Sequence, residues 1–219
     1  MAILIATLPL ETHAAINSHF RCGVLADYAI KIPLQYRNIS TEMDQPNPGN
    51  ICASKLNSIV ISVDGDYVKR VSTGNQGQRY GNDFSLVVAP ADKNRQTSTE
   101  DMIRALYDES SYSEKSSIPV RAPRIVGGMT YIEGQTPIGG IYRNDFYLAD
   151  DENGKFEYVM NCMVASNGLI DHCEIGFKPD QMGLCLRIRF NGSDFQNHRE
   201  ITREALAVVE SMIIGRASQ

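Results

Sequence analysis

The chain has 219 residues, a formal net charge of −5 and a pI near 5.4. This acidic balance provides no basic surface for a nucleic-acid backbone, so we expect no nucleic-acid partner. No apolar run reaches the roughly 18 residues of a membrane span, so no transmembrane segment is expected. The apolar start, residues 1–10, lacks the basic region and cleavage site that are typical of a signal peptide.

The first part of the chain is predicted to form short strands separated by turns and loops. The runs with strand composition are 29–33, 57–63, 67–71 and 84–88. The second and third of these should pair as a hairpin around the turn at 64–66. The polar, glycine-rich stretch 74–81 is predicted to be a surface loop. A capping box formed by Thr97 with Glu100, or by Ser98 with Asp101, predicts a short helix after it.

The polar, serine-rich stretch 108–117 is the best candidate for a linker or a mobile loop. We expect a single α+β domain over residues 1–219, and a subdivision into 1–110 and 119–219 around this linker is the alternative. Beyond it, two further strands are predicted at 124–132 and 141–149. An acidic turn follows at 150–154.

The C-terminal part is predicted to be a three-stranded meander closed by a helix. Asn167-Gly168 between apolar runs indicates a two-residue hairpin turn, which needs a positive φ at both residues. Counting outward, Cys162 faces Cys173 and Met160 faces Ile175. A third strand follows at 184–190. An apolar stripe at helical spacing then predicts an amphipathic helix over 199–213, with Gly215 placed to stop it.

These elements predict an α+β fold, because about nine strands and two helices do not alternate along the chain. We expect antiparallel meanders covered by the C-terminal amphipathic helix. A doubly wound nucleotide-binding sheet is disfavoured on the same ground.

Five cysteines are present, at positions 22, 52, 162, 173 and 185. They show neither a C-x-x-C pair nor zinc-ligand spacing, so no metal site is expected. In the predicted register, Cys162 and Cys173 lie about 5.5 Å apart between Cα atoms, which a disulfide can span. Two buried thiols in the core are the equally weighted alternative.

The sequence contains no nucleophile elbow, no Walker A loop and no H-E-x-x-H motif, so neither a catalytic residue nor a cofactor is predicted. Two alternatives remain open beside a binding protein. One is an enzyme or small-ligand binder with a pocket on the polar sheet face around His172, Glu174 and Arg187. The other is a structural or assembly subunit.

Both ends of the chain carry a family resemblance. Cys22-Gly23 with the segment 27–33 resembles the opening of periplasmic immunity proteins that neutralise type VI secretion effectors, especially the lipase-immunity group. The arginine-bearing strand, Asn191-Gly192 and the helix at 201–213 resemble the end of PsbP-like domains, an α/β/α sandwich that this group uses. The resemblance implies a non-enzymatic inhibitor that occludes a toxic secreted enzyme and needs no cofactor.

If the chain is such an inhibitor, its partner should contact loops, because binding residues concentrate on loops held by a rigid scaffold. The predicted contact residues are Asn75, Gln76, Arg79, Tyr80, Tyr112, Asp150, Asp151 and Glu152. The resemblance implies a periplasmic location, with a cytoplasmic one as the alternative.

Overall fold

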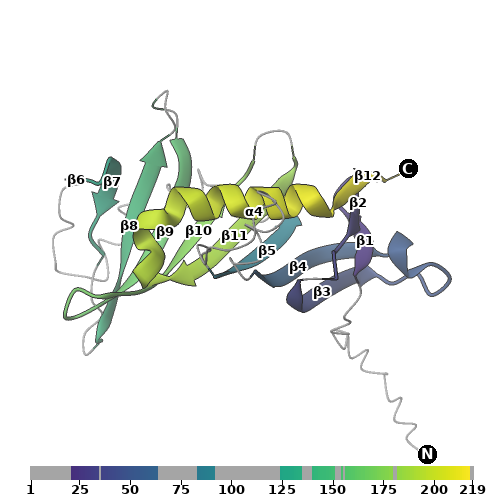
Figure 1. Cartoon of the computed structure of the whole chain (residues 1–219), viewed down its shortest axis with the longest axis horizontal. Helices are drawn as coiled ribbons and strands as arrows, with labels where there is room; N and C mark the ends of the chain where they lie inside the picture. The colour runs from purple at the N-terminus through teal and green to yellow at the C-terminus, as the bar shows by residue number, and fades with distance from the viewer. Residues whose placement is uncertain are drawn as a thin grey trace, which may run out of the picture.

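The computed structural model describes residues 21–34, 36–63, 83–91, 124–134, 140–150, 154, 156–179 and 182–217. Its strands are β1 (Cys22–Leu25), β2 (Tyr28–Lys31), β3 (Arg37–Gln45), β4 (Lys55–Val63), β5 (Phe84–Pro90), β6 (Arg124–Val126), β7 (Met129–Ile132), β8 (Tyr142–Asp150), β9 (Phe156–Ala165), β10 (Ile170–Phe177), β11 (Leu184–Asn191) and β12 (Ile213–Arg216). Its helices are the 3₁₀ helices η1 (Ile51–Ala53) and η2 (Gly192–Asn197) and the α-helix α4 (His198–Met212), as Figure 1 shows.

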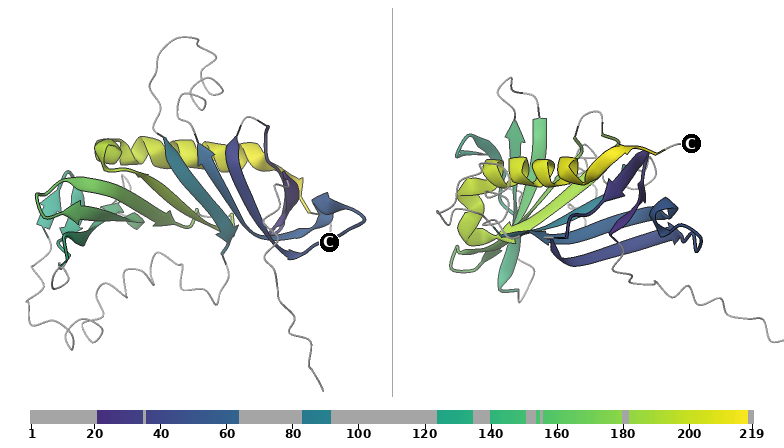
Figure 2. Two further views of the ribbon diagram at one scale, coloured as in Figure 1. Left: turned by 90° about the horizontal axis from the view of Figure 1, so that it is seen from below. Right: turned by 45° about the vertical axis from the view of Figure 1, so that its right-hand side comes forward.

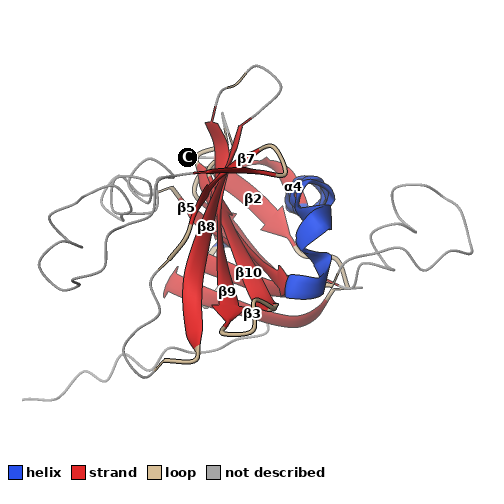
Figure 3. Cartoon of the chain, turned by 90° about the vertical axis from the view of Figure 1, so that its left-hand side faces the viewer, coloured by secondary structure: helices blue, strands red, loops and turns tan. Residues whose placement is uncertain are grey.

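The twelve strands of the described residues all belong to one sheet. Their order is β12-β2-β1-β4-β5-β11-β10-β9-β8-β7-β6, and β3 pairs with β4 beside this path. The pairing of β1 with β4 is parallel, and the other described pairings are antiparallel. The sheet is strongly curved, and α4 runs across its strands on one face (Figures 2 and 3).

The predicted α+β class and the PsbP-like α/β/α sandwich are wrong. The described residues form one large mixed sheet with a single α-helix on it, and they are mostly strand. The physical reason lies in β4 and β5, whose buried side chains alternate with period two and share one face with the meander. β5 therefore extends the meander by pairing with β11 and does not build a second layer.

The core lies between α4 and the face of the sheet toward it. Alternate strand residues meet the apolar stripe of the helix there. On the helix this stripe consists of Ile201, Ala205, Val208, Val209 and Met212. The predicted helix is therefore present, but it begins and ends one residue earlier than predicted. It does not stop at Gly215, because the chain passes from Met212 directly into β12, which pairs with β2.

The register of the β9–β10 hairpin agrees with the prediction, but its turn differs. Cys162 lies opposite Cys173 and Met160 opposite Ile175. Only Gly168 has a positive φ in the turn, at 84°, and its N–H donates to the Ala165 carbonyl at 2.8 Å. The loop therefore has three residues in place of two. A bulge between Ile170 and His172 then restores the predicted register.

The segment predicted as one strand at 124–132 is a hairpin, β6–β7. Gly127 and Gly128 have φ values of 59° and 79°, which are the left-handed values that a two-residue hairpin turn requires. Several other sequence expectations lie outside the described residues: the strand 67–71, the loop 74–81, the helix after Thr97 and the linker 108–117.

Two disulfides cross-link the sheet. Cys162 and Cys173 are bonded across β9 and β10 in the core, and both are fully buried. Cys22 of β1 is bonded to Cys52 of η1, a pairing that the sequence did not indicate. The fifth cysteine, Cys185 on β11, stands outside both disulfides.

Candidate interaction surface

Most of the predicted contact residues lie outside the described part of the chain. These are Asn75, Gln76, Arg79, Tyr80, Tyr112, Asp151 and Glu152. Asp150 is described and exposed at the end of β8, where its backbone carbonyl accepts a hydrogen bond from Arg199 of α4 at 3.0 Å. Arg199 also pairs with Glu157 at 3.3 Å. Asp150, the first residue of the acidic turn, is thus anchored to α4.

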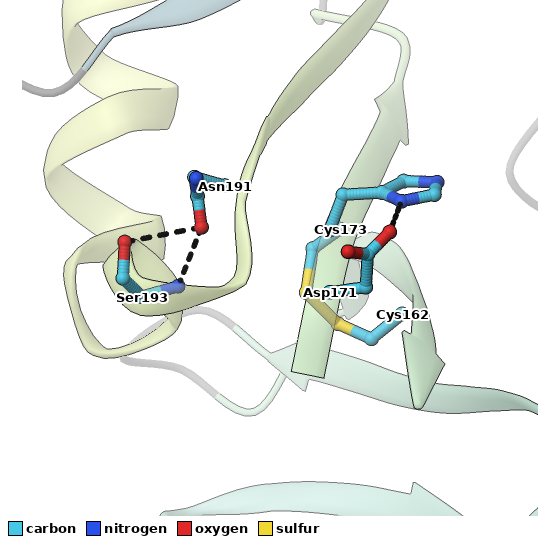
Figure 4. Close-up of a disulfide and its surroundings, with 6 residues drawn as sticks. Cys162, Asp171, Cys173, Asn191 and Ser193 are labelled. Atoms are coloured by element: carbon cyan, nitrogen blue, oxygen red, sulfur yellow. Dashed lines mark hydrogen bonds and ion pairs between the residues drawn. A yellow bond between two sulfur atoms is a disulfide. The ribbon is translucent and has the colours of Figure 1, made fainter. Parts of the chain in front are cut away.

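The polar sheet face does not bring His172, Glu174 and Arg187 to a common centre. Glu174 of β10 pairs with Arg187 of β11 at 3.1 Å. His172 has other partners: its Nδ1 lies 2.8 Å from Asp171 (Figure 4). Its Nε2 lies 2.8 Å from Arg189. Glu174 and Arg187 thus form one ion pair, and His172 contacts Asp171 and Arg189 in a second, separate cluster, which is typical of a solvated sheet face.

The same neighbourhood holds no nucleophile oriented by a base among its described residues. Cys173 is bonded to Cys162, so it carries no thiol. The Ser193 hydroxyl donates to the side-chain oxygen of Asn191 at 3.1 Å, where that oxygen also accepts the Ser193 N–H (Figure 4). Asn191 therefore serves as the cap of η2.

Three exposed apolar residues lie where β8 begins and β9 turns into β10. Ile141, Tyr142 and Leu169 are 65%, 39% and 67% exposed, and we call these three residues the end patch. Tyr142 lies opposite Ala165 in the ladder, and the Ala165 N–H donates to the Leu169 carbonyl at 2.8 Å. The Ser166 N–H donates to the Ile141 carbonyl at 2.9 Å, so backbone hydrogen bonds hold the three together. Such a patch on a rigid hairpin is a candidate contact surface.

A buried carboxylate organises the strands next to the end patch. Asp145 is 1% exposed and accepts hydrogen bonds from Tyr131 at 2.9 Å, from Arg143 at 2.8 and 3.2 Å, and from the Gly134 N–H at 3.0 Å. Four donors thus satisfy both oxygens of the charged group. The charge and hydrogen bonds of Asp145 raise the pKa of Arg143 above its ordinary value.

Two surface groups complete this network. Glu133 lies 3.8 Å from Arg143 and 3.2 Å from Arg124 of β6. The Arg124 guanidinium also lies over the Tyr131 ring, 5.0 Å from its centroid. The network therefore ties the outermost hairpin, β6–β7, to β8.

Aromatic side chains connect this network to the start of α4. The rings of Tyr131 and Tyr147 are 5.0 Å apart between centroids, and Tyr147 packs on Phe195 of η2 at 4.9 Å. Phe195 lies 6.2 Å from His198, which is hydrogen-bonded to the buried hydroxyl of Tyr158. Burial raises the pKa of Tyr158 to about 12, so its hydroxyl keeps its proton near neutral pH and can donate it to Nδ1 of His198.

The same burial makes the protein acid-sensitive at His198. Burial, and then the charge of Arg199, lower the pKa of His198 below its ordinary value. Above about pH 6.5 the imidazole is neutral in both the folded and unfolded chains, so it adds no pH dependence. Below that pH the unfolded chain binds the proton more readily than the folded chain does. The free energy of unfolding therefore decreases as the pH decreases, until the pH reaches the pKa of His198 in the folded protein.

Urea denaturation between pH 7.5 and 5 tests this expectation. His198→Asn keeps an acceptor for Tyr158 and should flatten the decline in that range. His172→Asn retains His198, so its decline should match that of the wild type. Equal slopes in all three proteins would contradict the assignment.

Two further searches of the described residues gave negative results. No group of three or more His, Cys, Asp or Glu side chains is arranged to hold a metal ion there. Within the same residues, no helix has both the length and the apolar character needed to cross a membrane.

Comparison with known proteins gives a structural match only. No protein-family model and no curated protein sequence matches the chain. Among solved structures, the fold is similar to that of Smlt3025, an immunity protein of the Stenotrophomonas maltophilia type IV secretion system. The match covers 90% of this chain and 93% of that chain, with a TM-score of 0.53 and 11% sequence identity. At this identity the match shows a shared fold.

Proposed function

We propose that this chain is a non-enzymatic immunity protein that binds and occludes a toxic secreted effector. The single observation that carries the proposal is the full-length fold match to an immunity protein, which extends over nine-tenths of both chains. The resemblance of Cys22-Gly23 and the segment 27–33 to the opening of effector-immunity proteins points in the same direction. Because a shared fold does not by itself establish a shared function, the proposal needs a functional test.

The chemistry of the described surface is consistent with a binding role. On the polar sheet face Glu174 pairs with Arg187 and Arg189 contacts His172, and the groups around Asp145 hold strands together. Exposed apolar side chains on a rigid hairpin are, by contrast, typical of protein interfaces. We therefore place the effector contact at the end patch, together with the predicted contact loops.

The disulfides bear on where the protein acts. Disulfides form and persist in oxidising compartments such as the periplasm. The two disulfides therefore support a periplasmic site of action. The sequence resemblance is to type VI immunity proteins, and the structural match belongs to a type IV system, so the proposal commits to a secreted effector without assigning its secretion system.

Co-expression with a candidate effector from the same gene neighbourhood tests the function. The effector directed to the periplasm should arrest growth, and this chain directed to the same compartment should restore it. Purified effector and chain should form a complex in size-exclusion chromatography. Continued toxicity, with both proteins folded and no complex formed, would refute the proposal for that effector.

A surface variant tests the contact site within the proposal. Leu169→Glu should weaken effector binding by at least about tenfold, because a charge in an apolar contact must be desolvated without a partner. Leu34→Glu is the matched control: Leu34 is 82% exposed and lies outside the end patch, so its affinity should equal that of the wild type. Isothermal titration calorimetry measures both. Equal affinities for the two variants would exclude the end patch while leaving the immunity function standing.

A further inference from the structure

The sheet has a narrow junction between β1 and β4. The strands β12, β2 and β1 connect to the remaining strands through a short parallel pairing, with Val24 opposite Lys55 and Leu25 opposite Leu56. One further backbone hydrogen bond, from the Val24 N–H to the Ser54 carbonyl at 2.8 Å, extends it. Among the described strand pairs, this one has the shortest register.

The Cys22–Cys52 disulfide spans this junction. Cys22 is the first residue of β1, and Cys52 lies in η1, which precedes β4 by one residue. η1 buries none of its residues, so no apolar side chain of its own holds it in place. The disulfide is therefore a covalent link across the pairing of β1 with β4, which is the shortest pairing among the described strands.

The two disulfides differ sharply in their access to solvent. Cys52 is exposed and Cys22 is partly exposed. Cys162 and Cys173 are each 0% exposed and belong to the hydrophobic core. A thiolate must reach a sulfur atom to open a disulfide, so it attacks Cys162–Cys173 only after the core opens.

We propose that Cys22–Cys52 is a redox-sensitive staple of the folded protein. Thiol reductants open it while Cys162–Cys173 stays closed, and its opening loosens β1, β2 and β12 from β4. The carboxyl end of α4 is affected as well, because α4 runs directly into β12, and β12 pairs with β2. The meander β8–β11 keeps its own disulfide and its place in the core.

The chemistry is ordinary thiol–disulfide exchange. A thiolate of the reductant attacks the sulfur of Cys52, the more exposed residue of the pair, forms a mixed disulfide and releases the Cys22 thiolate. A second reductant thiolate attacks the reductant sulfur of that mixed disulfide and releases the Cys52 thiolate. Two electrons pass from two reductant thiols to the cysteine pair, and the protons of those thiols end on Cys22 and Cys52. The reductant leaves as its own disulfide.

Graded treatment of the full chain with dithiothreitol at pH 8, followed by iodoacetamide and peptide mass spectrometry, tests the selectivity. Cys22 and Cys52 should be alkylated in the native protein, and Cys162 and Cys173 on the order of 100-fold more slowly. An unreduced sample gives the baseline alkylation of Cys185. Equal rates for the two disulfides would overturn the proposal, as would a Cys22–Cys52 bond that opens only in denaturant.

Hydrogen exchange on the same reduced protein tests the loosening. Amides in 22–31 and 213–217 should exchange at least about tenfold faster after reduction, while those in 156–190 keep their rates. The double variant Cys22→Ala, Cys52→Ala should show the same pattern without reductant. Unchanged exchange in 22–31 once the disulfide is open would refute the staple, and the wild-type experiment decides the question even if the variant does not fold.

Discussion

Gly192→Ala should lower the free energy of unfolding by about 3 kcal/mol, because an added side chain has no room there. A Cβ atom at this position would lie 2.1 Å from the Ile170 carbonyl oxygen and 2.5 Å from its carbonyl carbon. These are backbone atoms of β10, so no side-chain rotation relieves the clash. The first residue of η2 must then move away from β10. The shift of the urea midpoint measures the loss.

Gly49→Ala is the matched control for this variant. A Cβ there would meet nothing closer than the Asn47 side-chain oxygen at 3.6 Å, which is an ordinary contact. Its urea midpoint should stay within about 0.5 kcal/mol of the wild type. A Gly192→Ala protein as stable as this control would show that η2 does not need its close approach to β10.

The β9–β10 hairpin shows how much of the fold the sequence predicts. The turn geometry was predicted incorrectly, since the loop has three residues and Asn167 lacks the positive φ. The register was nevertheless right from His172 onward, because the bulge compensates for the longer loop. Burial explains this result: a slip by one residue would turn the whole buried row of β10 to solvent.

The N-terminal edge of the sheet could not be predicted in the same way. β1 has only four residues, and its parallel partner β4 begins 30 residues after β1 ends, so no local turn signal marks the pair. Five cysteines also allow many pairings, and spacing alone does not select Cys22–Cys52. Non-local contacts of this kind become visible only in the folded structure.

The end patch was missed for a related reason. In the sequence, Ile141 and Tyr142 look like ordinary strand residues, and Leu169 looks like the first residue after a turn. Their exposure depends on where β8 begins relative to the β9–β10 turn, which the pairing of Tyr142 with Ala165 determines. The position of Leu169 beside a predicted turn was the only sequence signal of its exposure.

Asp145→Asn should lower the free energy of unfolding by about 3 kcal/mol, although it changes neither size nor shape. Asp145 accepts four hydrogen bonds from Tyr131, Arg143 and the Gly134 N–H. An asparagine offers one oxygen and one NH2 group, so at least one of these donors would face another donor. Arg143, which is only 26% exposed, would also lose the charge that compensates its own.

Asp171→Asn is the control, since the Asp171 side chain is 56% exposed and makes a surface contact with His172. It should cost less than about 1 kcal/mol in urea denaturation.

Tyr131→Phe removes one donor from Asp145 and should cost about 1 kcal/mol. The double variant Tyr131→Phe, Asp145→Asn should then be less destabilised than the sum of the two, because the asparagine no longer meets the hydroxyl. Strict additivity would mean that Tyr131 and Asp145 do not act as one network, and the tie between β7 and β8 would then rest on their backbone pairing and on packing.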